Sequence, residues 1–154
     1  MAQDTLFRDS PRDPAPPSGV MTAHIDGGAR GNPGPSAYGV IVRNSEGKIV
    51  KELGEYLGLQ TNNFAEYSGL VAALEYAQKE KIPTLKVFSD SELLVKQMKG
   101  QYKVKSPGLV PLYERARSLA RQLQHFSIQH VRREQNRDAD RMVNQVLDKR
   151  ERKV

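Results

Sequence analysis

The stretch that decides the fold is residues 20–35, VMTAHIDGGARGNPGP. From Met21 to Ile25, apolar and polar side chains alternate, which predicts a strand with one buried face. Residues 27–35 are rich in Gly and Pro and predict a loop. Asp26 lies at the junction, so the sequence predicts an acidic side chain at the end of the first strand of the domain.

Downstream, the spacing of apolar residues predicts alternating strands and helices. Two strands joined by a turn at 44–47 extend the first strand into an antiparallel meander. The order strand, strand, strand, helix, strand, helix, helix, strand, helix predicts an α/β fold, a five-stranded mixed sheet flanked by helices. The bounds after the first strand are 38–43, 49–57, 62–80, 85–88, 91–98, 111–122 and 126–131, with a last helix containing Met142 and Leu147.

The ends of the chain differ in composition from its middle. Residues 1–19 contain four of the nine prolines, and proline removes backbone donors and disfavours helix. This segment is predicted to be a disordered tail. The folded domain is predicted to span residues 20–150, and residues 151–154 form a charged C-terminal end.

Composition and charge narrow the class of protein. The chain has 154 residues and no cysteine, which excludes disulfides and thiolate metal sites. It has no apolar run that would span a bilayer and no secretory signal at its start, so a cytoplasmic protein without a membrane is expected. A net charge of +6 and a pI of about 9.6 favour an anionic partner, nucleic acid first.

Four acidic residues lie where predicted strands end or helices begin. Each has an explanation that requires no function. Asp26 can form a turn, and Asp90 can cap a helix. Glu66 fits a capping box with Asn63, and Asp140 can complement the dipole of the last helix.

The joint placement of these acids favours a metal site. Sites in open sheets form at the carboxyl ends of parallel strands, where Asp26 and Asp90 are predicted. Clustered carboxylates repel one another unless cations neutralise them. Oxygen ligands suit Mg²⁺ or Mn²⁺, whereas the usual ligands of zinc are missing. Two such cations, about 3.5–4 Å apart, can activate water and stabilise an alkoxide leaving phosphorus.

Four motifs carry a resemblance to type 1 ribonucleases H. They are DGGARGNPGP at 26–35, TNNFAE at 61–66, SDS at 89–91, and a fourth containing His130, Asn136 and Asp140. The resemblance covers residues 21–147. It implies the ribonuclease H-like fold and endonucleolytic cleavage of the RNA strand of RNA–DNA hybrids, leaving 5′-phosphate and 3′-hydroxyl ends.

The resemblance also implies roles for the four carboxylates. Asp26 is expected to bridge two Mg²⁺ ions, for which Mn²⁺ can substitute. Glu66 and Asp90 are expected to hold one ion and orient water, and Asp140 to complete the second site.

Contacts with the hybrid are implied by the same motifs. Asn32, Asn62 and Glu92 are expected near the minor groove, where the 2′-hydroxyl distinguishes RNA from DNA. Glu92 departs from the Gln often found there, and an ionised carboxylate donates no hydrogen bond. Thr61 resembles the residue that binds a DNA phosphate, although Thr61 and Asn62 can also cap a helix. Asn136 matches a family residue that supports Asp140 and is also predicted to contact the substrate, although it can instead cap the last helix.

A basic cluster surrounds Tyr102 in the second half of the chain. It consists of Lys96, Lys99, Lys103 and Lys105. Contact of Lys103 and Lys105 with the DNA backbone is one interpretation, and a solvated face is the other. Some relatives carry a long basic protrusion here, whereas this segment, 100–107, is short. The departure affects the predicted affinity for the hybrid, not the chemistry.

The loop after the last predicted strand is a second departure. Many relatives carry a mobile His there, and this chain has Arg132 to Gln135 instead. Arg133 and Glu134 are the candidates to replace it. His130 lies on the strand before the loop and, like the other histidines, is predicted to be structural.

Other functions remain as alternatives. The main one is a catalytically weak nucleic-acid-binding module of the same fold, against which the full set of carboxylates argues. Another is a nuclease of different specificity; the loop motifs argue against an exonuclease, and activity on double-stranded RNA remains open. No feature indicates an obligatory protein partner, and a monomer is expected.

Overall fold

The computed structural model describes residues 19–152. The predicted disordered tail, apart from Gly19, lies outside the described residues, as do residues 153 and 154. In the part that is described, no helix combines the length and apolar character that crossing a bilayer requires. The elements are β2 Met21–Ala29, β3 Gly34–Arg43, β4 Ile49–Gln60, α1 Asn62–Lys79, β5 Thr84–Ser89, α2 Glu92–Met98, α3 Val110–Gln122, β6 His125–His130, a short 3₁₀ helix Arg133–Gln135 and α4 Arg137–Arg152.

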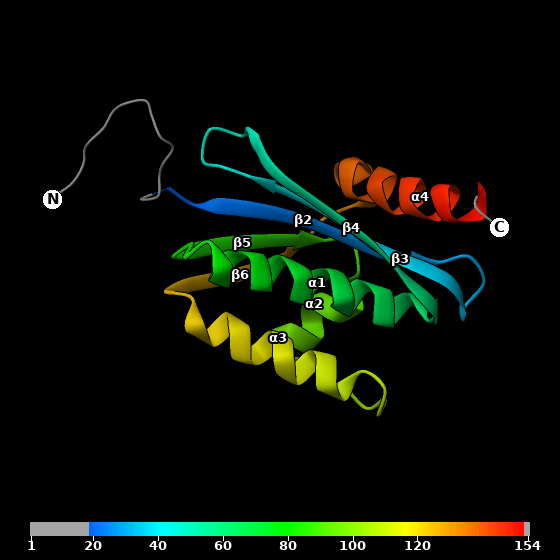
Figure 1. Ribbon diagram of the computed structural model, residues 1–154. Coiled ribbons are helices and arrows are strands. Elements are labelled where there is room, and N and C mark those ends of the chain that lie inside the picture. The colour runs from blue at the N-terminus through cyan, green and yellow to red at the C-terminus, as the bar shows by residue number, and fades with distance from the viewer. Residues whose placement is uncertain (1–18, 153–154) are drawn as a thin grey trace, which may run out of the picture.

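The strands form one five-stranded mixed sheet in the order β4-β3-β2-β5-β6 (Figure 1). β2, β3 and β4 are antiparallel, whereas β5 runs parallel to β2 and β6 runs parallel to β5. This topology confirms the predicted fold class. β2 is the central strand and contains the start of the first motif. Because β3 pairs with one edge of β2 and β5 with the other, residues from later in the chain lie on both sides of it.

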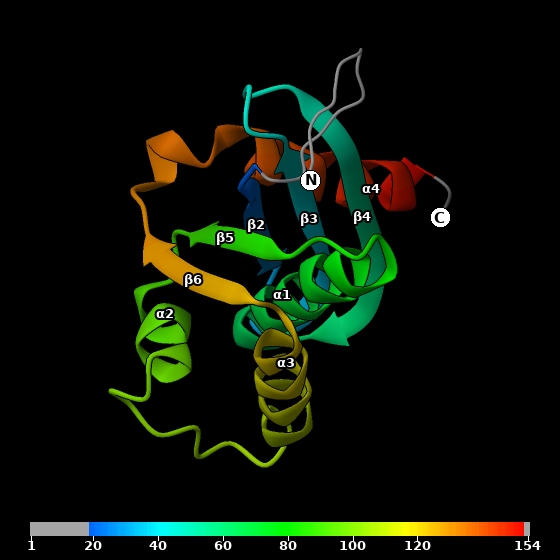
Figure 2. The same cartoon turned by 90° about the vertical axis from the view of Figure 1, so that its left-hand side faces the viewer.

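Helices cover the two faces of the sheet unequally. α1, α2 and α3 lie on one side, and α4 crosses β3 and β4 on the other (Figures 1 and 2). The main core lies beneath α1 and contains Ile25, Val40 and Leu70, all fully buried. A smaller apolar cluster joins Ala37 of β3 to Val143 and Leu147 of α4. α4 is thereby fixed against the sheet, which determines where Asp140 lies.

Several predicted boundaries are wrong at the ends of elements. β2 does not end at Asp26 but continues to Ala29, because Gly27 and Gly28 remain paired with Tyr38 and Ala37 of β3. The predicted loop over 27–35 is therefore only the short turn between β2 and β3. β4 reaches Gln60, three residues beyond its predicted end. α4 continues to Arg152, so the boundary predicted at residue 150 falls inside a helix.

Gly27 is required by the close approach of α1 to β2. A Cβ atom built on Gly27 would lie 2.3 Å from the carbonyl carbon of Ala65 and 2.4 Å from the backbone nitrogen of Glu66. Real side chains do not approach backbone so closely. The absence of a side chain at Gly27 therefore brings the backbone that carries Glu66 next to the strand that carries Asp26.

Gly27→Ala should lower the free energy of unfolding by roughly 2 kcal/mol or more, because α1 must move away from the sheet. Urea denaturation followed by circular dichroism measures the change. Gly28→Ala is the matched control, since its Cβ would meet nothing closer than Asn62 Oδ1 at 3.9 Å. Equal stability losses in the two variants would contradict the argument.

Candidate active site

A cleft of about 300 Å³ opens beside the end of the parallel pair β2 and β5. All four of the predicted carboxylates line it: Asp26 from β2, Glu66 from α1, Asp90 directly after β5, and Asp140 from α4. Pairing between β2 and β5 stops at Ile25 and Ser89. The residue after each of these partners is acidic, and the two acids therefore emerge side by side.

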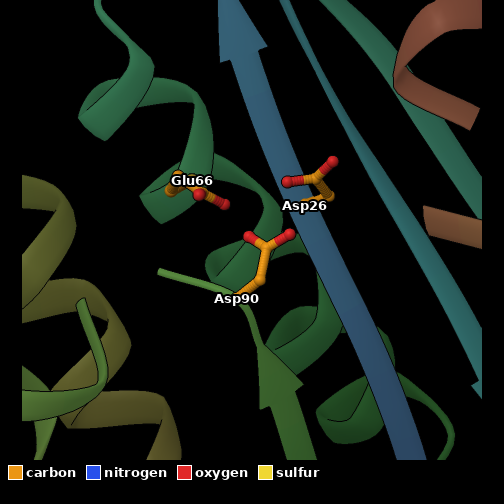
Figure 3. A group of neighbouring side chains, drawn as sticks. All are labelled: Asp26, Glu66 and Asp90. Atoms are coloured by element: carbon orange, nitrogen blue, oxygen red, sulfur yellow. The ribbon is translucent and has the colours of Figure 1, made fainter. Parts of the chain in front are cut away.

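Three of the four carboxylates form one mutually close group. Asp26, Glu66 and Asp90 each offer an oxygen, and these atoms lie within 4.8 Å of one another (Figure 3). Asp140 is outside this group of three but lines the same cleft, and its charge acts on Asp26. The arrangement is a compact group of three acids with the fourth beside it.

The local structure excludes most of the explanations that required no function. Asp26 lies within a strand, not in a turn. Thr61 caps α1 by accepting a hydrogen bond from the backbone nitrogen of Phe64 (3.1 Å), so Glu66 is the fifth helical residue and not the partner of a capping box begun by Asn63.

The structure also assigns the cap of α2 to a residue other than Asp90. The hydroxyl of Ser91 accepts from the backbone nitrogen of Leu94 (3.2 Å), so Ser91 is the cap. Only Asp140, in the first turn of α4, keeps its favourable position relative to a helix dipole.

Burial and mutual repulsion raise the pKa values of three of the acids. Burial, followed by the charges of Asp90 and Asp140, raises the pKa of Asp26 to about 8. The pKa of Glu66 rises well above its usual value because it is buried and faces Asp26 and Asp90. Burial also raises the pKa of Asp90, whereas a hydrogen bond from Asn136 and the charge of Arg133 lower it.

The donor set fits a divalent cation. Oε1 of Glu66 is buried and has no hydrogen-bond partner among the described residues, although carboxylate oxygens in a protein interior are normally paired. It lies in a group of hard oxygen atoms that repel one another without positive charge between them. Mg²⁺ and Mn²⁺ prefer such ligands.

Asn136 connects the acidic cluster to the centre of the sheet. It is 1% exposed, and its Nδ2 donates to the carbonyl of Ile25 (2.8 Å). Asn136 directly precedes α4, yet its side chain reaches across to β2 and to the carboxylate of Asp90. Its side chain is therefore buried against the backbone of β2 and the carboxylate of Asp90.

The predicted substrate residues fall into two separate places. Asn32 and Asn62 form one network, in which Asn32 Oδ1 accepts from the backbone nitrogen of Asn62 (3.0 Å) and Asn62 Oδ1 accepts from that of Ala29 (2.8 Å). Asn62 lines the cleft, and Thr61 precedes it as the helix cap.

Glu92, Lys103 and Lys105 are exposed and do not line the cleft. The carboxylate of Glu92 is paired with Lys96 (3.2 Å), whose ammonium lies 5.0 Å from the ring centre of Tyr102. These residues form a surface beyond the cleft, at α2 and the segment that follows it.

The loop after β6 contributes one of its two candidates to the cleft. Arg133 lines it, and Arg133 lowers the pKa of both Glu66 and Asp90. Glu134 is exposed and is not part of the lining. His24 packs on Phe88, with ring centres 4.7 Å apart, in agreement with a structural role.

Two further polar residues line the cleft that the sequence did not single out. Arg30, in the β2–β3 turn, is half-buried, and Asn144, on α4, is exposed. Arg30 lies within the first motif, but its partners are more than a hundred positions away in the chain. No local pattern identifies such a contact.

The fold and the carboxylate cluster together define the class: a domain of the ribonuclease H-like fold with a cluster of carboxylates in its cleft. A family model described as reverse transcriptase-like matches residues 24–146. A bifunctional protein of Mycobacterium tuberculosis is 43% identical over 129 residues, 83% of this chain and 35% of that protein. Ribonuclease HI of Halobacterium salinarum is 41% identical over 130 residues, 84% of this chain and 65% of that protein. The chain thus spans less than two thirds of the length of either relative.

Solved structures agree with the sequence comparisons. The crystal structure of LC11-RNase H1 in complex with an RNA/DNA hybrid has a TM-score of 0.79 and 39% sequence identity, covering 84% of this chain and 97% of that one. The chain belongs to the type 1 ribonuclease H family.

The raised pKa of Asp26 makes the metal-free protein sensitive to pH. The pKa of Asp26 in the folded protein, about 8, lies above its ordinary value of 3.8, so the folded state binds this proton more tightly than the unfolded state. Stability from this group is complete below pH 4 and is lost as the pH rises towards 8. Asp26→Asn removes the loss.

In the presence of a chelator, Asp26→Asn should raise the free energy of unfolding by roughly 2 kcal/mol at pH 8 and by little at pH 4. The gain at pH 8 is limited to this size because the structure around a buried charge relaxes. Thermal unfolding at both pH values measures the difference. Glu46→Gln, in the exposed β3–β4 turn, is the control. An equal effect of Asp26→Asn at both pH values would show that ionisation of the buried Asp26 carboxyl is not the cause.

Proposed function

We propose that this protein hydrolyses the RNA strand of RNA–DNA hybrids endonucleolytically, with two divalent cations, and leaves 5′-phosphate and 3′-hydroxyl ends. The observation that carries the proposal is the group of three carboxylates within 4.8 Å, together with the contact between Asn32 of the β2–β3 turn and Asn62 of α1. A family member of the same fold was crystallised with an RNA/DNA hybrid.

Asp26, Glu66, Asp90 and Asp140 are the residues proposed to hold the cations. Mg²⁺ is the proposed metal, and Mn²⁺ substitutes for it because both prefer oxygen ligands. When bound, two such ions supply neutralising charge, an activated water and stabilisation of the leaving alkoxide. Asp26 occupies the centre of the group and is proposed to serve both ions.

Recognition of the RNA strand is proposed for Asn32 and Asn62. Their Oδ1 atoms are engaged by the backbone nitrogens of Asn62 and Ala29. The side-chain NH₂ groups are therefore the atoms proposed to meet 2′-hydroxyl and base-edge acceptors. Thr61, at the cap of α1, is proposed to bind a phosphate of the DNA strand, and its capping bond to Phe64 nitrogen leaves the hydroxyl proton to donate.

The exposed surface beyond the cleft is proposed to bind the nucleic-acid backbone. Lys103 and Lys105 are proposed to contact phosphates there, and such binding is independent of sequence and sensitive to salt. Glu92 is paired with Lys96, and we propose that it accepts from a 2′-hydroxyl. A monomer in the cytoplasm, without an obligatory protein partner, remains a prediction.

The test of the proposal is cleavage of an end-labelled RNA–DNA hybrid. With Mg²⁺, internal cuts confined to the RNA strand are expected, and chelator should abolish them. Asp26→Asn should lower kcat on the order of 10³-fold or more, because it removes charge from the centre of the group. Duplex RNA and duplex DNA serve as competing substrates. Tight hybrid binding without cleavage in Mg²⁺ or Mn²⁺ would instead support the binding module.

Arg133 is proposed to act where other family members carry a loop His. Arg133 lines the cleft, and its positive charge favours the ionised forms of Glu66 and Asp90. Arg133→Ala should lower kcat by about 10- to 100-fold. Glu134→Ala, one residue along the same loop and outside the cleft, should change kcat less than about twofold. Steady-state kinetics at saturating Mg²⁺ compare the two, and equal rates would refute the role of Arg133.

A further inference from the structure

Arg30 links the turn between β2 and β3 to the far end of the chain. Its Nη2 atom lies 2.8 Å from Asp148 Oδ1 and 3.0 Å from Asn144 Oδ1, and its Nη1 atom lies 2.8 Å from Glu151 Oε2. All three partners are on α4, the helix that carries Asp140. A single side chain from the first motif thus contacts about two turns of the last helix.

Asn144 stands between Arg30 and Asp140. Its Nδ2 donates to the backbone carbonyl of Asp140 (3.2 Å) and lies 3.5 Å from Oδ2 of the Asp140 carboxylate. Asn144 and Asp140 are one helical turn apart, and both line the acidic cleft. The NH₂ group of Asn144 therefore contacts a carboxylate that is proposed to hold metal. It is not itself a metal ligand, because an NH₂ group only donates hydrogen bonds.

Arg30 determines which way the amide of Asn144 points. An arginine has five donors and no acceptor, so the atom of Asn144 that faces it must be the oxygen. The NH₂ group is then directed to the opposite side, towards Asp140. Without Arg30 the amide is free to turn its oxygen towards the carboxylate, where two acceptors would repel one another.

We infer that Asn144 is a positioning residue that orients the Asp140 carboxylate, and that Arg30 acts through Asn144 by fixing its amide. The inference rests on the proposed function, because it assigns Asp140 to a metal. Through this chain of contacts, the loop that carries Asn32 and the helix that carries Asp140 are held in one arrangement. Groups that orient a metal ligand typically change metal affinity or activity 10–100-fold when removed.

The test compares Mn²⁺ binding and Mn²⁺-dependent cleavage in matched variants of the full chain. Free Mn²⁺ is measured by electron paramagnetic resonance during titration of the protein alone, and hybrid cleavage is measured over the same Mn²⁺ range. Asn144→Ala is the principal variant. Asn144→Leu, which is similar in size and favours helix, serves if the Ala variant does not fold. Gln145→Ala removes a neighbouring exposed amide of α4 that lies outside the acidic cleft.

Asn144→Ala should raise the Mn²⁺ concentration for half-maximal binding and half-maximal cleavage about tenfold. The KM for the hybrid at saturating Mn²⁺ should remain that of the wild type, which a general loss of structure would not allow. The inference would be overturned if these two Mn²⁺ concentrations in Asn144→Ala were both within twofold of those in Gln145→Ala.

A double-mutant cycle tests the part assigned to Arg30. Arg30→Ala alone should also raise the Mn²⁺ concentration for half-maximal binding and cleavage. Adding it to Asn144→Ala should have little further effect, because the two residues act in series. Fully additive effects would overturn the relay. Cleavage by the wild type is measured in the same series. If the wild type binds Mn²⁺ but leaves the hybrid intact, the proposed function fails. The comparison of Mn²⁺ binding between the variants then still decides the role of Asn144.

Discussion

The rest of the structure depends on holding like charges together. Three carboxylate oxygens lie within 4.8 Å in a site where two of the three residues are almost fully buried. In the absence of a cation, folding must overcome both their repulsion and the loss of their hydration. The buried core beneath α1 and the hydrogen-bonded central strand supply that free energy. A cation bound among the acids would relieve the repulsion.

The framework brings the acids together through backbone contacts. Gly27 has no side chain, so α1 packs directly against β2 and carries Glu66 to Asp26. The parallel pairing of β2 with β5 ends at Ile25 and Ser89, so that Asp90 follows at the same edge. α4 then approaches from the other face, where Gly39 and Gly54 leave room for Met142. Each acid belongs to a different element, which makes the site a product of the whole fold.

The surroundings of the acids separate two tasks. Asn136 and Arg133 act on the charge of the cluster, since each lowers the pKa of Asp90. The Asn32–Asn62 network and the exposed surface around Tyr102 lie further out and present hydrogen-bonding groups and positive charge. Arg30 spans the two regions because it contacts α4 from within the first motif. Arg30 therefore links the turn that carries Asn32 to the helix that carries Asp140.

The sequence alone determined the order of the elements, the class of the sheet, the family and all four acids of the cleft. These follow from local information, because apolar periodicity reports the secondary structure and motif spacing is carried by neighbouring residues. Tertiary structure decided that β2 continues through Gly27 and Gly28, since the deciding hydrogen bonds come from β3. It also decided that Asp140 lies beside the group of three, that Asn136 turns inward, and that Arg133 and not Glu134 faces the cleft. Such contacts join residues distant in the chain, and their geometry depends on how whole elements pack, which no local pattern records.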